Sequence, residues 1–269
     1  SPDEKIEKEF SEERASQVKR IFYTLPSPLE LSRLFKKEGI IYSPEMMHQK
    51  DKSDSYLVSR KKALNLGIYG ADLSYAGLFS KHEDALEYFA ICQSVSEEVG
   101  VSNSFEKDFI SRLERNPNNR DTLLQVISNF FLNNDSYLKD QEIQNISAYV
   151  LTGGWIEGMY LGTRMVDDKT NAEGLKNIIA SQKYSLENLI LMLDNTEDKG
   201  EFANINYQLN ELFSMFQAIE YPSYKEPTDS IDSDGVMVLD NSSGEIKISE
   251  DTFRDIKEKV SSIRKSIIE

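Results

Sequence analysis

The chain has 269 residues, 39% of them apolar and 10% aromatic, so it is long and apolar enough to bury a large core. Lys and Arg total 31 against 46 Asp and Glu, which gives a formal net charge of -15. Such an excess of negative charge disfavours nucleic acid and anionic lipid headgroups as partners, because the short basic clusters at 36–37 and 60–62 are surrounded by acids.

The N-terminal region is predicted to be helical. Residues 3–23 have sparse apolar positions typical of a charged first helix. Residues 27–30 form a capping box with proline at the first helical position, which predicts a short helix over 29–37 that ends at Gly39. Residues 40–52 are then expected to form a polar loop.

Two histidines flank the next predicted helix, which we expect to begin at Ser53 and Asp54. His48 lies in the polar loop before it, and His82 lies beside acids at the start of the helix that follows. Both imidazoles are therefore expected to be solvated. With Cys92 as the one cysteine, an intramolecular disulfide is excluded and a Cys/His zinc site lacks ligands.

Glycine is unusually frequent in two helix-length segments, 63–77 and 149–162. Glycine inside a helix costs up to about 1 kcal/mol relative to alanine, so its repeated use indicates close backbone approach. Gly154, Gly158 and Gly162 recur every four residues and would share one helical face. We expect these two segments to form the close-packed centre of the fold.

Apolar residues at helical spacing predict five further helices with a shared core. Cys92 belongs to the first of these stripes and is interpreted as a small core residue. The stripes cover residues 86–99 (ended by Gly100), 105–113, 123–131, 175–193 and 202–219.

The pattern changes at Tyr221, after which residues 222–235 are rich in Pro, Ser and Asp. Residues 236–239 and 245–248 are predicted to pair as a small β-hairpin, followed by an amphipathic helix over 250–268. The sequence therefore predicts an all-α multi-helix bundle (residues 1–221) with a connection, hairpin and terminal helix (222–269) as an appendage packed on it. No apolar run is long enough to cross a bilayer.

Asp72 and Glu157 are the acids of most interest, because each lies in a glycine-rich segment without a cation three or four residues away. Each carboxyl is expected to lie at the solvent edge of its helix, to pin a loop by accepting backbone N–H bonds, or to line a pocket. If it is buried, it needs a partner or a raised pKa. Paired carboxylates could also act as general acid and base. The aromatic candidates for lining such a pocket are Tyr69, Tyr75, Trp155 and Tyr160.

Two acidic segments resemble metal-binding motifs. Asp167 and Asp168, followed by Asn171, resemble the first aspartate-rich motif of terpenoid synthases, which are all-helical and bind diphosphate through magnesium. The last position departs from that motif and no second metal motif accompanies it, so a polar turn is the competing interpretation. Residues 230–235 resemble a calcium loop but lack its terminal glutamate.

Residues 66–75 (Leu-Gly-Ile-Tyr-Gly-Ala-Asp-Leu-Ser-Tyr), the acidic start and the cysteine-poor helical body resemble helical extracytoplasmic lipoproteins of Bacteroidetes, a group without a known activity. The resemblance implies a periplasmic or outer-membrane-anchored location. Because the chain begins at Ser1 without methionine, a tag, a signal peptide or a lipidated cysteine is expected to have preceded it.

The sequence contains no diagnostic catalytic motif and no cofactor motif, so neither catalysis nor a cofactor is expected. The preferred hypothesis is a non-enzymatic cell-envelope binding or interaction protein, with a small molecule or an envelope protein as partner. The alternatives are a metal-dependent all-helical enzyme that uses Asp167 and Asp168, and a structural subunit of an envelope assembly.

Overall fold

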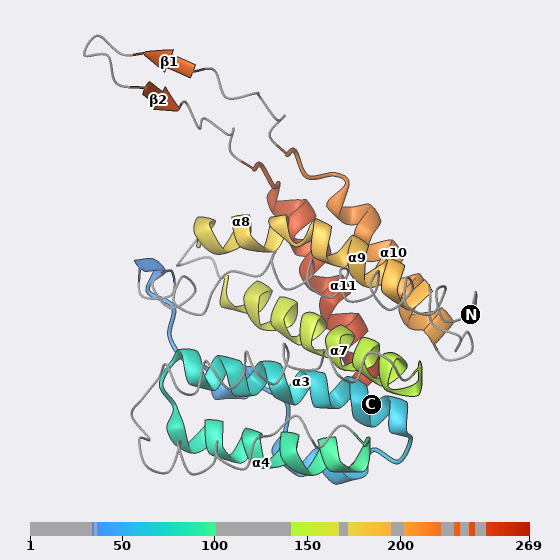
Figure 1. The fold of residues 1–269 in the computed structure, drawn as a ribbon. Coiled ribbons are helices and arrows are strands. Elements are labelled where there is room, and N and C mark those ends of the chain that lie inside the picture. Colours follow the sequence, from blue (N-terminus) through green and yellow to red (C-terminus); the bar gives the residue numbers. More distant parts are fainter. Residues whose placement is uncertain are drawn as a thin grey trace.

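The computed structural model describes residues 34, 37–100, 141–166, 172–194, 202–221, 229–231, 237–239 and 246–269. Within these ranges it is a bundle of α-helices, which confirms the all-α prediction (Figure 1). Two short 3-10 helices, Pro44–Met46 and Lys50–Ser55, precede the first long helix. The α-helices are α3 (Ser59–Leu78), α4 (His82–Glu98), α7 (Gln141–Met165), α8 (Glu173–Ser181), α9 (Lys183–Asp194), α10 (Phe202–Phe216) and α11 (Glu250–Ile268).

Helices α3 and α7 form the most extensive helix pair and run side by side (Figure 1). A Cβ atom added at Gly67 of α3 would lie 2.0 Å from the carbonyl oxygen of Val150, and one added at Gly153 of α7 would lie 1.9 Å from that of Leu64. Since real Cβ atoms never approach other heavy atoms so closely, only glycine permits this backbone contact.

The three glycines that recur every four residues in α7 do not all take part in this contact. Gly154 faces Gly67, but a Cβ at Gly158 would have no heavy atom within 4 Å, and one at Gly162 would meet the Ile179 side chain of α8 at 3.6 Å. The expectation of one close-packed glycine face is therefore wrong beyond Gly154. Two crossing helices are closest over about one turn, so glycines farther along the helix leave the contact.

Helix α4 packs on α3 and follows its predicted stripe except at one position. Phe89, Cys92 and Val95 are buried, which confirms Cys92 as a core residue, and Gly100 ends the helix with a positive φ of 80°. Leu86 is 43% exposed, so its predicted core position is wrong. Gly39 also has a positive φ, 69°, as predicted for a glycine that ends a helix.

The stripe predicted over residues 175–193 is divided into α8 and α9 at Gln182. Apolar periodicity continues across this boundary, because Leu175, Ile179, Leu186 and Leu189 all face the same core. Periodicity alone therefore does not locate the break.

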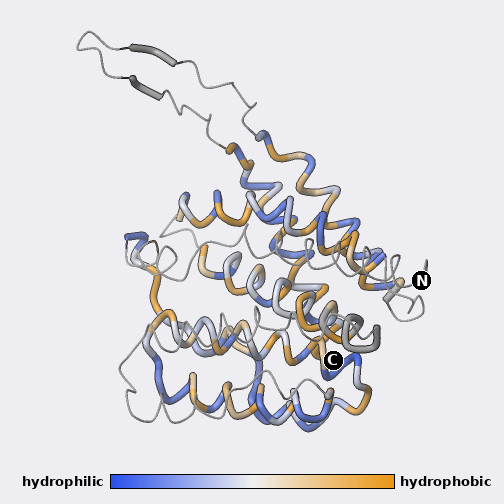
Figure 2. The backbone as a smooth tube through the Cα atoms, viewed as in Figure 1, coloured by the Kyte–Doolittle hydropathy of each residue, from blue (hydrophilic) through white to orange (hydrophobic). Residues whose placement is uncertain are grey.

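Helix α11 is a core element. Its N-cap, Ser249, accepts a hydrogen bond from the backbone N–H of Thr252. Its apolar residues are buried against α7 and α10, and Figure 2 shows hydrophobic and hydrophilic residues alternating along it, as expected for one buried stripe. The terminal helix therefore packs on the bundle and contributes a full apolar stripe to its core. The buried apolar residues are Phe253, Ile256, Val260, Ile263 and Ile267.

The two strands that pair are not both the ones predicted. Strand β2 (Met237–Leu239) pairs in antiparallel with β1 (Asp229–Ile231), whereas Lys247 forms an isolated bridge with Glu220. Three-residue strands specify their register weakly, so the sequence could not distinguish the two pairings. The helices predicted over 3–23, 105–113 and 123–131, Asp167, Asp168, and most of the 230–235 loop lie outside the described residues.

Candidate functional site

Asp72 of α3 and Glu157 of α7 both lie in the interior, each with 0% of its surface exposed. The solvent-edge interpretation of these acids is therefore wrong. They come from the two helices that pack at Gly67 and Gly153, and the negative charge of Glu157 acts on Asp72. The close backbone contact thus places two acids together in a region without solvent.

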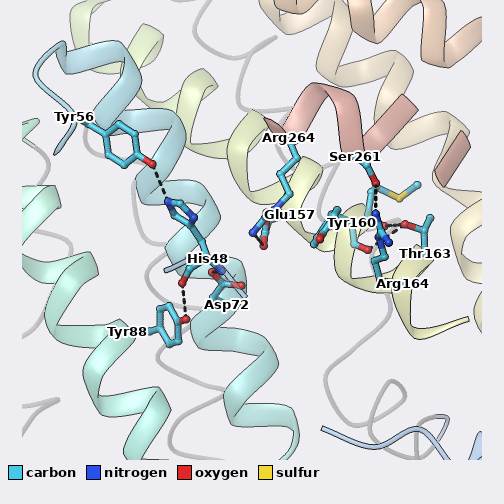
Figure 3. A network of polar contacts seen from close by, with 11 residues as sticks. His48, Tyr56, Asp72, Tyr88, Glu157, Tyr160, Thr163, Arg164, Ser261 and Arg264 are labelled. Carbon is cyan, nitrogen blue, oxygen red and sulfur yellow. Dashed lines mark hydrogen bonds and ion pairs between the residues drawn. The ribbon is translucent and has the colours of Figure 1, made fainter. Parts of the chain in front are cut away.

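The cation for Glu157 comes from α11. Arg264 donates from Nε and Nη2 to the two carboxylate oxygens of Glu157, at 2.5 and 2.8 Å (Figure 3). Its guanidinium also lies 4.1 Å from the ring centroid of Tyr160, a cation–π contact. The bidentate geometry is the strong form of an Arg–carboxylate pair.

Asp72 has a less complete set of partners. Its Oδ2 accepts the backbone N–H of His48 at 3.0 Å, whereas Oδ1 is buried without a hydrogen-bond partner among the described residues. Burial raises the pKa of Asp72 well above its ordinary value of 3.8, and the negative charge of Glu157 raises it further. Burial also raises the pKa of Glu157, and Arg264 opposes that rise.

The backbone of residues 42–56, which we call the strap, is held by side chains of α3 and α4. It contains both 3-10 helices, so Ser53 and Asp54 lie in the strap and do not begin α3 as predicted. Beyond Asp72, three tyrosines bind its backbone: Tyr75 accepts the N–H of Ser43 (3.0 Å), Tyr69 donates to the carbonyl of Gln49 (3.1 Å), and Tyr88 donates to the carbonyl of His48 (2.7 Å).

His48 is 5% exposed, so the expectation of a solvated imidazole is wrong. Its Nε2 lies 2.7 Å from the hydroxyl of Tyr56, which donates to the carbonyl of Ile268 at the end of α11. Burial and the nearby charge of Arg264 lower the pKa of His48 to about 4. The imidazole is therefore neutral at neutral pH and links the strap to the chain's last helix.

The structure joins five of the six predicted site residues. Tyr69, Asp72 and Tyr75 bind the strap, and Glu157 and Tyr160 contact Arg264. Trp155 is buried, but its Nε1 has no partner among the described residues and no polar contact joins it to the others.

Three residues that take part in these buried contacts were not among the predicted site residues: His48, Tyr88 and Arg264. Arg264 could have been found, because it is a cation that directly follows Ile263 in the apolar stripe of α11. His48 and Tyr88 gave no such signal, since their role depends on where the strap folds back.

The described part of the chain contains no group of three or more His, Cys, Asp or Glu side chains placed to hold a metal ion. Within the same residues, no helix has both the length and the hydropathy needed to span a membrane. Comparison of the chain with protein-family models, with curated proteins and with solved structures finds no match.

Proposed function

We propose that this protein is a non-enzymatic binding or interaction protein of the cell envelope. The observation that carries the proposal is that the side chains at its centre hold polypeptide backbone. Tyr69, Asp72 and Tyr75 each bind a backbone group of the strap, and so does Tyr88 from α4. The envelope location is supported by the resemblance of residues 66–75 to extracytoplasmic lipoproteins.

The ionisable groups of this site are neutral or paired, which favours binding of polar groups over acid–base or nucleophilic catalysis. Glu157 is neutralised by Arg264, and burial favours the neutral form of Asp72 and of His48. Burial also raises the pKa of the Cys92 thiol, which disfavours the nucleophilic thiolate. A ligand that reaches α3 must therefore offer hydrogen-bonding groups like those of the strap, namely amide N–H and C=O groups.

The test is a native mass spectrum of the purified protein, compared with its mass after denaturation. A reproducible excess mass that is lost on denaturation supports a retained ligand, and a clean dimer supports a second copy as the partner. A bare monomer that also fails to capture amide-rich ligands contradicts the proposal. Tyr69→Phe then tests the location of the site, because it removes the hydroxyl that binds the strap, and Asp72→Asn tests whether ligand binding depends on the acid.

A further inference from the structure

We propose that Asp72 and Glu157 share one proton in the native protein, and that loss of this proton opens the strap. This inference does not depend on the proposed function, because it follows from the charges and contacts of the cluster. It assigns the two acids a conformational role.

The charge count requires the proton. Two carboxyl groups are fully buried beside one guanidinium, and that guanidinium is bound to Glu157 through both oxygens. If both acids were ionised, the interior would hold an uncompensated negative charge, which is strongly unfavourable. A proton on Asp72 Oδ1 removes this charge and turns the unpartnered atom into a donor toward Glu157.

No other described group around Asp72 supplies a second positive charge. The strap contributes a neutral imidazole, and α4 contributes a phenol and a thiol that favour their neutral forms. The titratable and charged groups that act on Asp72 are Tyr69 and Tyr75 on its own helix α3, Tyr88 and Cys92 on α4, Glu157 on α7, Arg264 on α11 and His48 in the strap.

The strap is the segment that detaches from α3 when Asp72 ionises. Helices α3 and α7 are fixed by backbone contact at Gly67 and Gly153, and α11 buries a full apolar stripe. The strap buries only Met47, His48 and Tyr56 completely. Its other attachments are hydrogen bonds, the ion pairs of Lys50 with acids of α4, and the stacking of Tyr42 on α3. Its opening therefore admits water to Asp72 at the lowest cost in apolar burial.

The experiment is amide hydrogen exchange of the intact chain between pH 6 and 9, with each rate corrected for intrinsic base catalysis. In the wild type, the protection of the Ser43 and His48 amides falls as Asp72 ionises, by about tenfold per pH unit for one proton. Amides in the middle of α11 keep their protection and serve as the internal control.

Asp72→Asn is the matched variant, because its amide donates to Glu157 and still accepts the N–H of His48 without an ionisable proton. We expect its strap protection to be independent of pH. Equal slopes in the wild type and this variant overturn the proposal, as does a wild-type protection that does not change with pH. Glu157→Gln is the second variant: Asp72 then ionises as the partner of Arg264, and the same slope must disappear.

Discussion

The guanidinium of Arg264 binds both carboxylate oxygens of Glu157, a residue 107 positions earlier in the chain. This contact joins α11 to α7, and through Asp72 and His48 it reaches α3 and the strap. The strap and α3, which are neighbours in sequence, therefore meet the distant helices α7 and α11 at one buried set of charges. A buried ion pair is not necessarily stabilising in itself, but the loss of one partner leaves a charge without compensation.

Arg264→Met is therefore expected to lower the free energy of unfolding by about 3–5 kcal/mol, because the two buried carboxyls lose the one cation that acts on both among the described residues. Urea unfolding at neutral pH measures this loss. Arg164→Met is the matched control: Arg164 is exposed on α7 and bonds Ser261 of α11, so its removal should cost less than about 0.5 kcal/mol. Equal losses in the two variants would contradict a special role for Arg264.

The losses of unfolding free energy caused by substituting Asp72 and Glu157 are expected to be strongly non-additive. Asp72→Asn should cost little at neutral pH, because it mimics the protonated acid, and in Glu157→Gln the remaining Asp72 can ionise opposite Arg264. The double variant leaves Arg264 buried without a counterion and should lose about 3 kcal/mol more than the sum of the single losses. A double-mutant cycle by urea unfolding measures this term, and additive losses would show that the carboxyls do not substitute for each other.

The helical architecture could be predicted from sequence because apolar periodicity reports which face of each helix is buried. The same pattern could not show that the stripe over 175–193 divides at Gln182, since the core faces of both helices continue in register. Asp72 and Glu157 were identifiable as acids without a local cation. Their partners were not, because Arg264 and His48 come from segments whose docking depends on the whole bundle.

Gly67→Ala is expected to destabilise the fold by several kcal/mol, since its Cβ would lie 2.0 Å from the Val150 carbonyl oxygen and the helices must separate. Gly158→Ala, in the same helix pair, meets no heavy atom within 4 Å and should stabilise the protein by up to about 1 kcal/mol through helix propensity. Thermal unfolding of both variants measures the difference. Similar effects at the two glycines would show that the backbone contact at Gly67 is not essential.

His48 is expected to make the protein less stable in acid. The folded-state pKa is lowered to about 4 from 6.5, so between these values the unfolded chain binds a proton that the folded chain does not. Stability therefore falls as the pH falls through this window, by up to about 1.4 kcal/mol per pH unit. The unfolding free energy of His48→Gln relative to wild type, measured from pH 7 to 4, should lack this decline.

His82→Gln, at the start of α4, is the matched histidine control for that experiment. Asp72 acts in the opposite direction: its raised pKa makes stability fall as the pH rises above about 3.8. The two effects oppose each other between pH 4 and 6.5, so each single variant should reveal the slope of the other residue. A His48→Gln variant with the wild-type acid profile would contradict this assignment.

The most direct measurement is the infrared spectrum of the carboxyl groups at neutral pH, recorded as the difference between wild type and Asp72→Asn. A protonated carboxylic acid has a carbonyl band that is separate from carboxylate bands. The shared-proton account predicts such a band in the wild type, and predicts its absence both in Asp72→Asn and in Glu157→Gln. A wild-type spectrum without this band, or with a band that both variants retain, would contradict the account.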